Sequence, residues 1–371
     1  MHVLTLFLSA GKSLTWWDSE GLLSREILLY LELLRRDTFD RIQIFTYDAA
    51  DRALVAQRAA GDPLFGRIDL IAPTSGRGGA AWSILGVMRH RAAIARSRVL
   101  KTNQISGAWA AILARLLTGR PLVLRMGYVL SRRFTLNGQR LKASLAALVE
   151  RFGIACATRV IVTSREAADH FARKGMGQGR VRLLPTYVDT GIFAAKTDYD
   201  FDGPAIAVGR MRPQKNLPEL LRGCANAGVA LTLVGKGEQE GELRALADTL
   251  PVPVTFIRSI DNADLAALMA RHCLFILPSL HEGLPKVLIE AMATGLVCIG
   301  TPIPGITDLI EDGVTGYLTD GFDADAIARA IGRARSERSG GIGGAARARI
   351  EQAFGLGVYA DAEAAIYAEL A

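Results

Sequence analysis

The segment PSLHEGLPKVLIEAMATG, residues 278–295, decides the fold of this 371-residue chain. The apolar run LFIL precedes Pro278 and predicts a buried strand, and a short loop then carries Glu282 and Gly283. A helix is expected to open near Pro285, because the missing N–H of proline would be unpaired in a first helical turn anyway. A buried strand followed by a loop and a helix is the repeating unit of a parallel α/β sheet.

The loop and the helix start predict a ligand site of mixed charge. Free backbone N–H groups between Gly283 and Val287, together with the positive end of the helix dipole, favour an anion. Two glutamates beside an anion site point to bound hydroxyl groups, since a carboxylate accepts hydrogen bonds from two vicinal hydroxyls of a ribose or hexose. In one helix a separation of eight would turn them apart by about 800°, so Glu282 in the loop and Glu290 in the second helical turn reach different parts of one ligand. The alternative is two solvated glutamates, although Glu290 lies in the apolar run KVLIEAMA, where burial without a ligand is costly.

Two further loops carry chemistry. In AVGRMRPQKN, residues 207–216, a strand runs into Gly209, and Arg210 and Lys215 follow before a helix. Arginine offers a planar fork for phosphate oxygens and lysine a mobile point charge, although a basic loop that only caps a sheet is the alternative. In LVGKGEQEGEL, residues 233–243, Gly235 and Gly237 leave a strand and enter a helix without the G-x-G-x-x-G spacing. A dinucleotide-dependent oxidoreductase is therefore disfavoured.

Short apolar runs alternate with helix-length segments along the whole chain, which predicts two doubly wound parallel domains. The weakly periodic segment 189–202 is the predicted linker, and SGGIGG, residues 339–344, is the predicted surface loop before the closing helices. The predicted domains are residues 1–190 and 191–355, followed by a tail helix at 356–371. Strands are predicted at residues 3–8, 41–47, 98–102, 121–126, 159–163, 181–184, 205–208, 230–234, 254–257, 274–277 and 297–299.

Charge is distributed unevenly between the halves of the chain. Residues 1–195 hold 28 Lys and Arg against 14 Asp and Glu, whereas residues 196–371 hold 16 against 23. Residues 70–149 contain thirteen basic and no acidic side chains, which predicts an anionic partner for the first domain. The alternative is that these arginines only solubilise an Ala/Leu-rich protein.

The remaining composition predicts a soluble, cytoplasmic protein. The four cysteines show neither metal-ligand spacing nor a disulfide framework, so buried thiols in a reducing compartment fit best. No apolar run reaches the roughly 18 residues of a membrane-spanning helix. The opening MHVLTLFLSAGK lacks the positively charged start of a signal peptide and is interpreted as a first strand.

The three loop segments, in this order, resemble the second domain of family 4 glycosyltransferases, which have the GT-B fold. The matching pieces are strand–G-R-x-x-x-x-K, V-G-x-G-E, and the pair E-x7-E inside P-S-x-x-E-G-L-P-K-x-x-x-E-A-M-A-x-G. The resemblance is close over residues 204–320 and extends to the first half mainly as architecture. It implies two Rossmann-like domains facing across a cleft, an acceptor domain first and a nucleotide-sugar domain second, with a final helix that crosses back.

The resemblance also implies an activity and its residues. A sugar would pass from a nucleoside-diphosphate donor to a glycan or lipid-linked acceptor with retained anomeric configuration, without a metal or other cofactor. Arg210 and Lys215 would hold the diphosphate, Glu290 the ribose, and Glu282 hydroxyls of the donor sugar. The remaining substrate contacts would come from Gly283, Leu284, Pro285, Gly209, Gly235 and Gly11.

The first half departs from the family pattern in two places. Many members carry a glycine-rich acceptor loop after the first strand, but here it reads SAGKSLTWWDSEG, with only Gly11 and Gly21. Many members also have a histidine near the donor sugar, where this chain has Arg125, Met126 and Gly127. No catalytic histidine is therefore nominated.

Two other functions stay open at this point. A GT-B sugar-nucleotide epimerase or hydrolase would use the same donor pocket, and a non-enzymatic nucleic-acid-binding protein is suggested only by the basic stretch. The predicted partners are the sugar donor, a glycan or lipid-linked acceptor and an anionic inner membrane surface, with no nucleic acid. Arg132 and Arg133, with Tyr128 and Phe134 nearby, are the predicted membrane contact.

Overall fold

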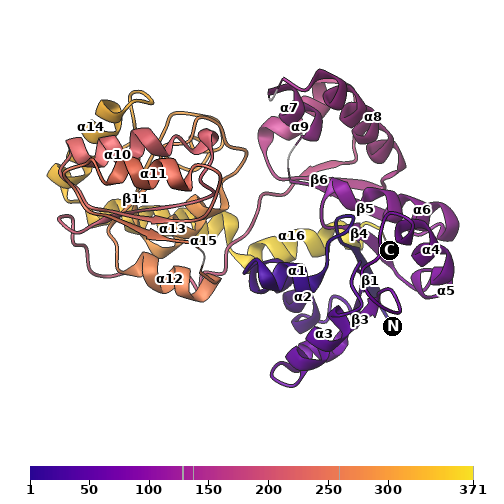
Figure 1. Ribbon diagram of the computed structural model, residues 1–371. Coiled ribbons are helices and arrows are strands. Elements are labelled where there is room, and N and C mark those ends of the chain that lie inside the picture. The colour runs from indigo at the N-terminus through magenta and orange to yellow at the C-terminus, as the bar shows by residue number, and fades with distance from the viewer. Residues whose placement is uncertain (128, 137, 259, 371) are drawn as a thin grey trace. The chain divides into compact units, whose positions relative to one another are not determined.

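The computed structural model describes all residues except 128, 137, 259 and 371, and leaves out the side chains of residues 133 and 136. The chain divides into two compact units. Unit 1 comprises Met1–Pro185 and Tyr359–Ala371, and unit 2 comprises Thr186–Val358. Each unit is an α/β domain with a parallel sheet between two helical layers (Figure 1), as the alternating sequence pattern predicted.

Unit 1 contains a seven-stranded parallel sheet of order β3-β2-β1-β4-β5-β6-β7. Because the strand order reverses between β1 and β4, right-handed crossovers put α2 and α3 on one face and α4, α5, α6, α8 and α9 on the other. The strands are β1 (Val3–Phe7), β2 (Arg41–Phe45), β3 (Ile68–Ile71), β4 (Val99–Thr102), β5 (Leu122–Met126), β6 (Arg159–Val162) and β7 (Val181–Leu183). The helices are α1 (Leu14–Ser19), α2 (Leu23–Arg35), α3 (Asp51–Ala59), η1 (Pro63–Arg67), α4 (Trp82–Arg89), α5 (Arg91–Ile94), η2 (Ile105–Gly107), α6 (Ala108–Thr118), α7 (Leu130–Leu136), α8 (Arg140–Cys156) and α9 (Arg165–Arg173).

Strand β3 was missed by the sequence analysis. Its run IDLI is interrupted by Asp69, which removes the continuous apolar signal of a buried strand. The strand lies at the sheet edge, where the Asp69 carboxylate accepts two hydrogen bonds from the Arg41 guanidinium of neighbouring β2 at 2.6 and 2.7 Å. An edge strand tolerates such a side chain because one of its sides is open to water.

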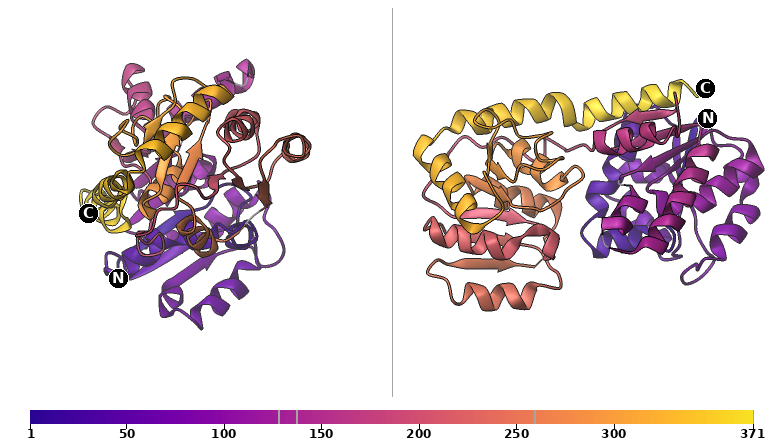
Figure 2. Two further views of the ribbon diagram at one scale, coloured as in Figure 1. Left: turned by 90° about the vertical axis from the view of Figure 1, so that its left-hand side faces the viewer. Right: turned by 90° about the horizontal axis from the view of Figure 1, so that it is seen from above.

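Unit 2 contains a six-stranded parallel sheet of order β10-β9-β8-β11-β12-β13. Figure 2 shows this unit in two further views. Helices α10, α11 and α14 contribute to the core on one face, and α12, α13 and α15 to the core on the other. The strands are β8 (Ala205–Val208), β9 (Leu231–Val234), β10 (Val254–Ile257), β11 (Leu274–Leu277), β12 (Val297–Gly300) and β13 (Tyr317–Leu318). The helices are η3 (Pro213–Lys215), α10 (Leu217–Asn226), α11 (Glu240–Ala247), α12 (Asn262–Ala270), α13 (Lys286–Thr294), α14 (Ala324–Glu337) and α15 (Gly340–Phe354).

The predicted surface loop at residues 339–344 is wrong, because α15 begins at Gly340 and is helical through that segment. The glycines serve close packing instead of a turn. A Cβ at Gly343 would lie 2.1 Å from the Gly295 carbonyl oxygen at the end of α13, and one at Gly340 would meet the Tyr199 ring at 2.9 Å. Only a residue without a side chain lets these segments approach so closely.

The end of the chain is bound to unit 1 by a buried polar cluster. Helix α16 (Leu356–Ala368) brings Glu363 against the Lys101 ammonium of β4, and both side chains are fully buried. The Tyr367 hydroxyl donates to the same carboxylate. Burial lowers the pKa of Lys101, whereas the Glu363 carboxylate opposes that shift. Loss of either partner would leave an uncompensated charge in the core.

Candidate functional site

Three loops of unit 2 gather at one edge of its sheet. Strands β9, β8 and β11 are neighbours and parallel, so their carboxyl ends meet at the same edge. The loops that follow them contain the three sequence segments predicted to carry chemistry. In doubly wound sheets this edge, at the reversal of strand order between β8 and β11, is where ligands bind.

The loops after β8 and β9 are packed backbone against backbone. A Cβ at Gly235, where φ is +151°, would lie 1.9 Å from the carbonyl oxygen of Gly209. One at Gly237 would lie 2.3 Å from the carbonyl oxygen of Met211, whose N–H donates to the Lys236 carbonyl at 3.0 Å. Gly209, Gly235 and Gly237 therefore set the spacing of these loops.

The structure brings Lys215 and Glu282 together. The Lys215 Nζ lies 2.5 Å from Oε1 of Glu282, and their side chains are only 17% and 10% exposed. The Lys215 stem crosses Gly209, where a Cβ would lie 3.3 Å from its Cε. The Ser279 hydroxyl donates to the same Oε1 at 2.7 Å. The cation and the carboxylate are thus held in one geometry by residues from two loops.

Additional hydrogen bonds join the loop after β8 to the loop after β11. The Leu280 N–H donates to the Gln214 carbonyl at 2.9 Å, and the Gln214 side-chain amide donates to the His281 carbonyl at 2.7 Å. Neither Gln214 nor Ser279 was singled out from the sequence. The sequence could have indicated them only through their position, because each is a polar residue inside one of the motifs. Gln214 precedes Lys215, and Ser279 lies three residues before Glu282.

The start of α13 is open to a ligand. Its N-cap is Pro285, whose side chain has no acceptor for the N–H groups of the first turn. Gly283, two residues earlier, is exposed, with nothing within 4 Å of where a Cβ would be. Pro285 therefore stands one position before the first helical turn in which it was predicted. Behind the loop, a Cβ at Gly305 (φ +85°) would lie 2.0 Å from the Gly283 carbonyl oxygen. The loop is consequently fixed from behind, while Gly283 at its front is exposed just before the positive end of the α13 dipole.

The two predicted glutamates occupy different environments. Glu290 lies in the second turn of α13 and is 2% exposed, whereas Glu282 lies in the preceding loop. Leu284 is partly buried against the unit 2 core, so its backbone is better suited to ligand contact than its side chain. Pro285 is buried, has no N–H, and its carbonyl already accepts from the Leu288 N–H at 3.1 Å, so a direct contact from Pro285 is not favoured. The placement agrees with the geometric argument that one loop and one helical turn present these carboxylates at separate points.

Arg210 differs from Lys215 in having an exposed side chain. Within the described residues, its guanidinium takes part in no ion pair or hydrogen bond that competes with a ligand. An exposed guanidinium keeps its five donors available for phosphate oxygens.

Two predicted positions lie in unit 1. Gly11 forms the turn after β1 with φ +72°, and α1 begins shortly after it. The buried Asp51 carboxylate already accepts hydrogen bonds from the Leu14 and Thr15 N–H groups at 2.9 Å, so that helix start is capped internally. Arg125, which stands where many family members have histidine, donates to the Asn103 carbonyl at 3.2 Å.

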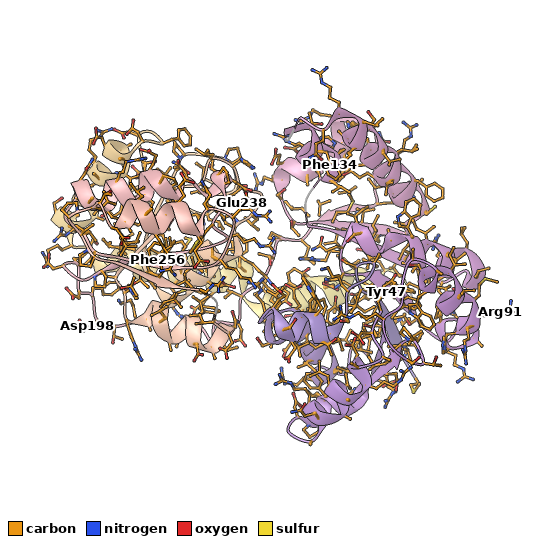
Figure 3. The ribbon with its side chains drawn as sticks, in the orientation of Figure 1. Tyr47, Arg91, Phe134, Asp198, Glu238 and Phe256 are labelled. Atoms are coloured by element: carbon orange, nitrogen blue, oxygen red, sulfur yellow. The ribbon has the colours of Figure 1, made fainter. Side chains whose placement is uncertain are left out.

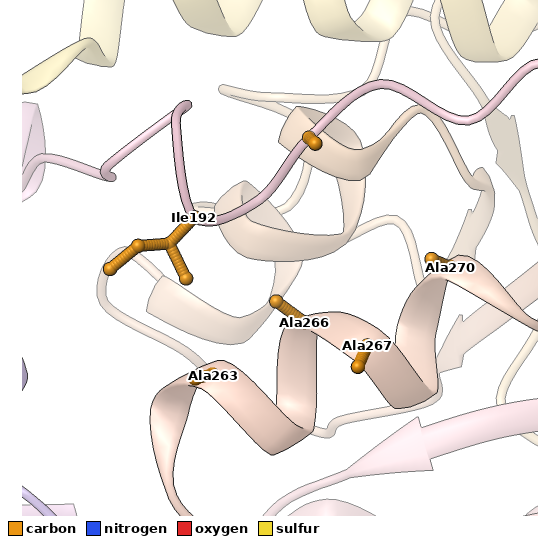
Figure 4. A pocket seen from close by; sticks show the side chains of 6 residues that line it. Ile192, Ala263, Ala266, Ala267 and Ala270 are labelled. Carbon is orange, nitrogen blue, oxygen red and sulfur yellow. The ribbon is translucent and has the colours of Figure 1, made fainter.

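Unit 2 also contains an apolar hollow away from charged groups. A hollow of about 340 Å³ in unit 2 is lined by Ile192, Ala194 and four alanines of α12, and no charged side chain lines it (Figure 4). No three His, Cys, Asp or Glu side chains in the described part of the chain come together in a way that could hold a metal ion. None of the helices described is long and apolar enough to cross a bilayer.

Comparison with known families assigns both halves of the chain. The family described as "Glycosyl transferases group 1" matches residues 199–353, and the "Glycosyl transferase 4-like domain" matches residues 24–186. Among curated relatives, the lipopolysaccharide core biosynthesis glycosyltransferase LpsE of Rhizobium meliloti is 31% identical over 157 residues, which are 41% of this chain and 46% of LpsE. The GDP-mannose-dependent α-(1-6)-phosphatidylinositol monomannoside mannosyltransferase of Mycolicibacterium smegmatis is 32% identical over 47% of this chain and 52% of its own length. The chain thus spans about half the length of these relatives.

Solved structures share the fold over the whole chain. HepE of Anabaena, in complex with UDP and glucose, matches with a TM-score of 0.76 at 19% identity and covers 99% of both chains. Sucrose-phosphate synthase from Thermosynechococcus elongatus matches with a TM-score of 0.76 at 20% identity, over 100% of this chain and 99% of its own. At this identity the likeness establishes the arrangement of strands and helices.

Proposed function

Because this chain belongs to the family 4 type of GT-B glycosyltransferases, we propose that it transfers a sugar from a nucleoside-diphosphate sugar to a glycan or lipid-linked acceptor in cell-surface polysaccharide or glycolipid synthesis. The ion pair between Lys215 and Glu282 beside the open start of α13 carries this proposal. In this proposal Lys215 is the cation for a diphosphate and the neighbouring Glu282 is the carboxylate for sugar hydroxyls, close to the positive end of the α13 dipole.

The leaving diphosphate explains the cations. When the bond between the sugar and the diphosphate breaks, negative charge grows on the phosphate oxygens, and fixed positive groups lower the barrier by stabilising it. In the proposed arrangement, Lys215 and Arg210 bind these oxygens and the α13 N-terminus adds its dipole. These groups supply the charge from the chain itself, so we expect turnover to persist when EDTA is added.

The carboxylates account for the hydroxyl groups of the donor. Glu290, buried in the second turn of α13, is the proposed acceptor for the ribose hydroxyls, and Glu282 is the proposed acceptor for hydroxyls of the transferred sugar. Retention of the anomeric configuration is part of the proposal. It predicts that a donor with an α-linked sugar yields an α-linked product, which the anomeric proton coupling in an NMR spectrum distinguishes from the β form.

The proposal is tested first by nucleotide binding. A panel of UDP, GDP, ADP and their sugar derivatives is added to the purified chain and thermal unfolding is recorded. A ligand at 100 times its dissociation constant stabilises the folded state by about 2.7 kcal/mol, which raises Tm measurably. UDP belongs in the panel because HepE was solved with it, and GDP because the Mycolicibacterium relative is named as GDP-mannose-dependent. No shift with any nucleotide would contradict the proposal.

The binding nucleotide then separates transfer from its alternatives. Incubation of the matching sugar nucleotide without an acceptor should leave it intact, whereas a hydrolase would release free sugar and an epimerase would change the sugar. Arg210→Ala should lower transfer by about one to three orders of magnitude, and Arg210→Lys should recover only part of the loss. Full activity of Arg210→Ala would remove this residue from the diphosphate site.

A further inference from the structure

The outer surface of the helical layer in unit 1 is unusually apolar. Helix α8 exposes Leu141, Leu145, Leu148 and Phe152, with the first 86% exposed and the others 46–63%. These residues follow the spacing i, i+4, i+7 and i+11, so they form one continuous stripe along the helix. The opposite side of α8 contributes Ile154 to the core, which leaves the apolar stripe facing away from the sheet.

Two neighbouring helices extend this stripe. Helix α4 exposes Ile84, Leu85 and Met88, and α6 exposes Trp109 and Leu116, each at least 52% exposed. Helix α4 contacts α6, and α6 contacts α8, so the three helices lie side by side in one layer (Figure 1). We call this surface the α4–α6–α8 face. A contiguous apolar patch of this kind on a protein surface indicates a contact with a membrane or with another protein.

The same face carries cations without neighbouring acids. Arg89 and Arg91 lie at the end of α4 and the start of α5, and Lys142 and Arg151 flank the apolar stripe of α8; all four are exposed. Arg91 extends from the helical layer into solvent (Figure 3). Within the described residues, none of the four forms an ion pair.

The acidic side chain closest in sequence is turned away from this face. Glu150 of α8 is 1% exposed, and its carboxylate accepts hydrogen bonds from the Ser131 N–H at 3.0 Å and the Ser131 hydroxyl at 2.6 Å. Residues 70–149 contain no Asp or Glu. The α4–α6–α8 face therefore combines exposed aliphatic groups with uncompensated positive charge.

From this combination we propose that the α4–α6–α8 face docks the protein on a bilayer rich in acidic lipid. Apolar side chains enter the boundary between headgroups and acyl chains, while Lys and Arg contact the anionic headgroups. A second copy of the chain fits less well, because a symmetric interface would bring the same cations against each other. Nucleic acid would use the cations but would leave the aliphatic stripe exposed.

This face differs from the membrane contact predicted from the sequence. Arg132 is engaged in an ion pair with Glu166 of α9 at 2.6 Å, so its charge is compensated. Tyr128 and the Arg133 side chain lie outside the described residues. This inference rests on the proposed action on lipid-linked acceptors. Vesicle binding can be measured without any turnover. A protein that transfers sugar but does not bind vesicles would therefore contradict the docking proposal alone.

The test measures sedimentation of the full chain with vesicles of phosphatidylglycerol and phosphatidylcholine, and with pure phosphatidylcholine. Binding is expected only to the acidic vesicles and is expected to weaken with salt. Lys142→Glu/Arg151→Glu should lower the partition coefficient by about 30-fold, since each cation near an acidic surface contributes about 1 kcal/mol. Leu141→Gln/Leu145→Gln/Leu148→Gln should lower it by at least about tenfold.

A matched control makes the same change in net charge on unit 2. Arg271 and Arg329 are both exposed, and Arg271→Glu/Arg329→Glu should leave vesicle binding within about twofold of the unchanged protein. Thermal unfolding confirms that each variant is folded. Three results would overturn the proposal. The protein could bind neutral and acidic vesicles equally, both α8 variants could bind as well as the unchanged protein, or the unit 2 control could lose as much binding as the α8 variants. A dimer that the leucine variant converts to monomer would assign the face to a second copy instead.

Discussion

Replacing Glu282 by glutamine should tighten binding of the bare nucleoside diphosphate while slowing sugar transfer. In the ligand-free protein the Lys215 ammonium is neutralised by the Glu282 carboxylate at 2.5 Å. A diphosphate has to share this cation with the carboxylate. Glu282→Gln keeps the side-chain shape and an oxygen acceptor but removes the competing charge, so Lys215 becomes more available.

The magnitude follows from the loss of the opposite charge, since the ammonium then keeps only a hydrogen bond to a neutral amide oxygen. An ion pair with partly exposed partners contributes up to about 1 kcal/mol. Its loss corresponds to about fivefold tighter binding of the diphosphate. Transfer should fall by on the order of 100-fold, because the donor sugar loses its charged hydrogen-bond acceptor in the transition state.

Isothermal titration with the bare nucleoside diphosphate and initial rates with its sugar form measure the two effects. In a Lys215→Ala background, Glu282→Gln should give no tightening, because no cation is left to release. Ser279→Ala removes the other donor to Oε1 but keeps both charges, and it should leave the nucleotide affinity within about twofold. Weaker nucleotide binding by Glu282→Gln would refute the reasoning and place this carboxylate at the nucleotide.

Three further predictions concern unit 2. Glu290→Gln should weaken bare nucleotide binding about tenfold in the same titration, through loss of charged hydrogen bonds to the ribose, and unchanged affinity would exclude that role. Gly235→Ala should lower the free energy of unfolding by about 3 kcal/mol, because its Cβ would overlap the facing carbonyl oxygen, whereas Gly241→Ala in α11, with open space around it, should be neutral or stabilising. Burial holds the pKa of His272 below its ordinary value, so as pH falls through about 6.5 the unfolded chain takes up this proton before the folded chain does. The wild type should therefore lose more stability than His272→Gln between pH 6.5 and 5.5 in urea titrations, by up to about 1 kcal/mol, and equal slopes would contradict this assignment.

Local patterns were sufficient for most elements of the fold. The uninterrupted apolar runs AIAV and LFIL predicted the central strands β8 and β11 with the limits that the structure has. Such runs are informative because a strand in a parallel sheet is covered by helices on both faces and must be apolar throughout. The edge strand β3, interrupted by Asp69, does not meet that condition and escaped detection.

Glycine shows where local patterns fail. In SGGIGG the sequence signal for a loop is strong, yet the segment belongs to α15 because its glycines allow contact with Gly295 and Tyr199, residues distant in the chain. The sequence shows that these positions are glycine, but it does not show which distant segment packs against them. Those neighbours are known only from the tertiary structure.

By itself, the sequence determined the residue types of the candidate site and their order along the chain: cations after β8, and glutamates in the loop and helix after β11. Only the tertiary structure decided that Lys215 and Glu282, 67 residues apart, form one ion pair, supported by Ser279. It also decided that the apolar stripes of α4, α6 and α8 form a single exposed surface. The physical reason is that helix and strand periodicity act over a few residues, whereas contacts between loops and between helices depend on the order in which strands join the sheet.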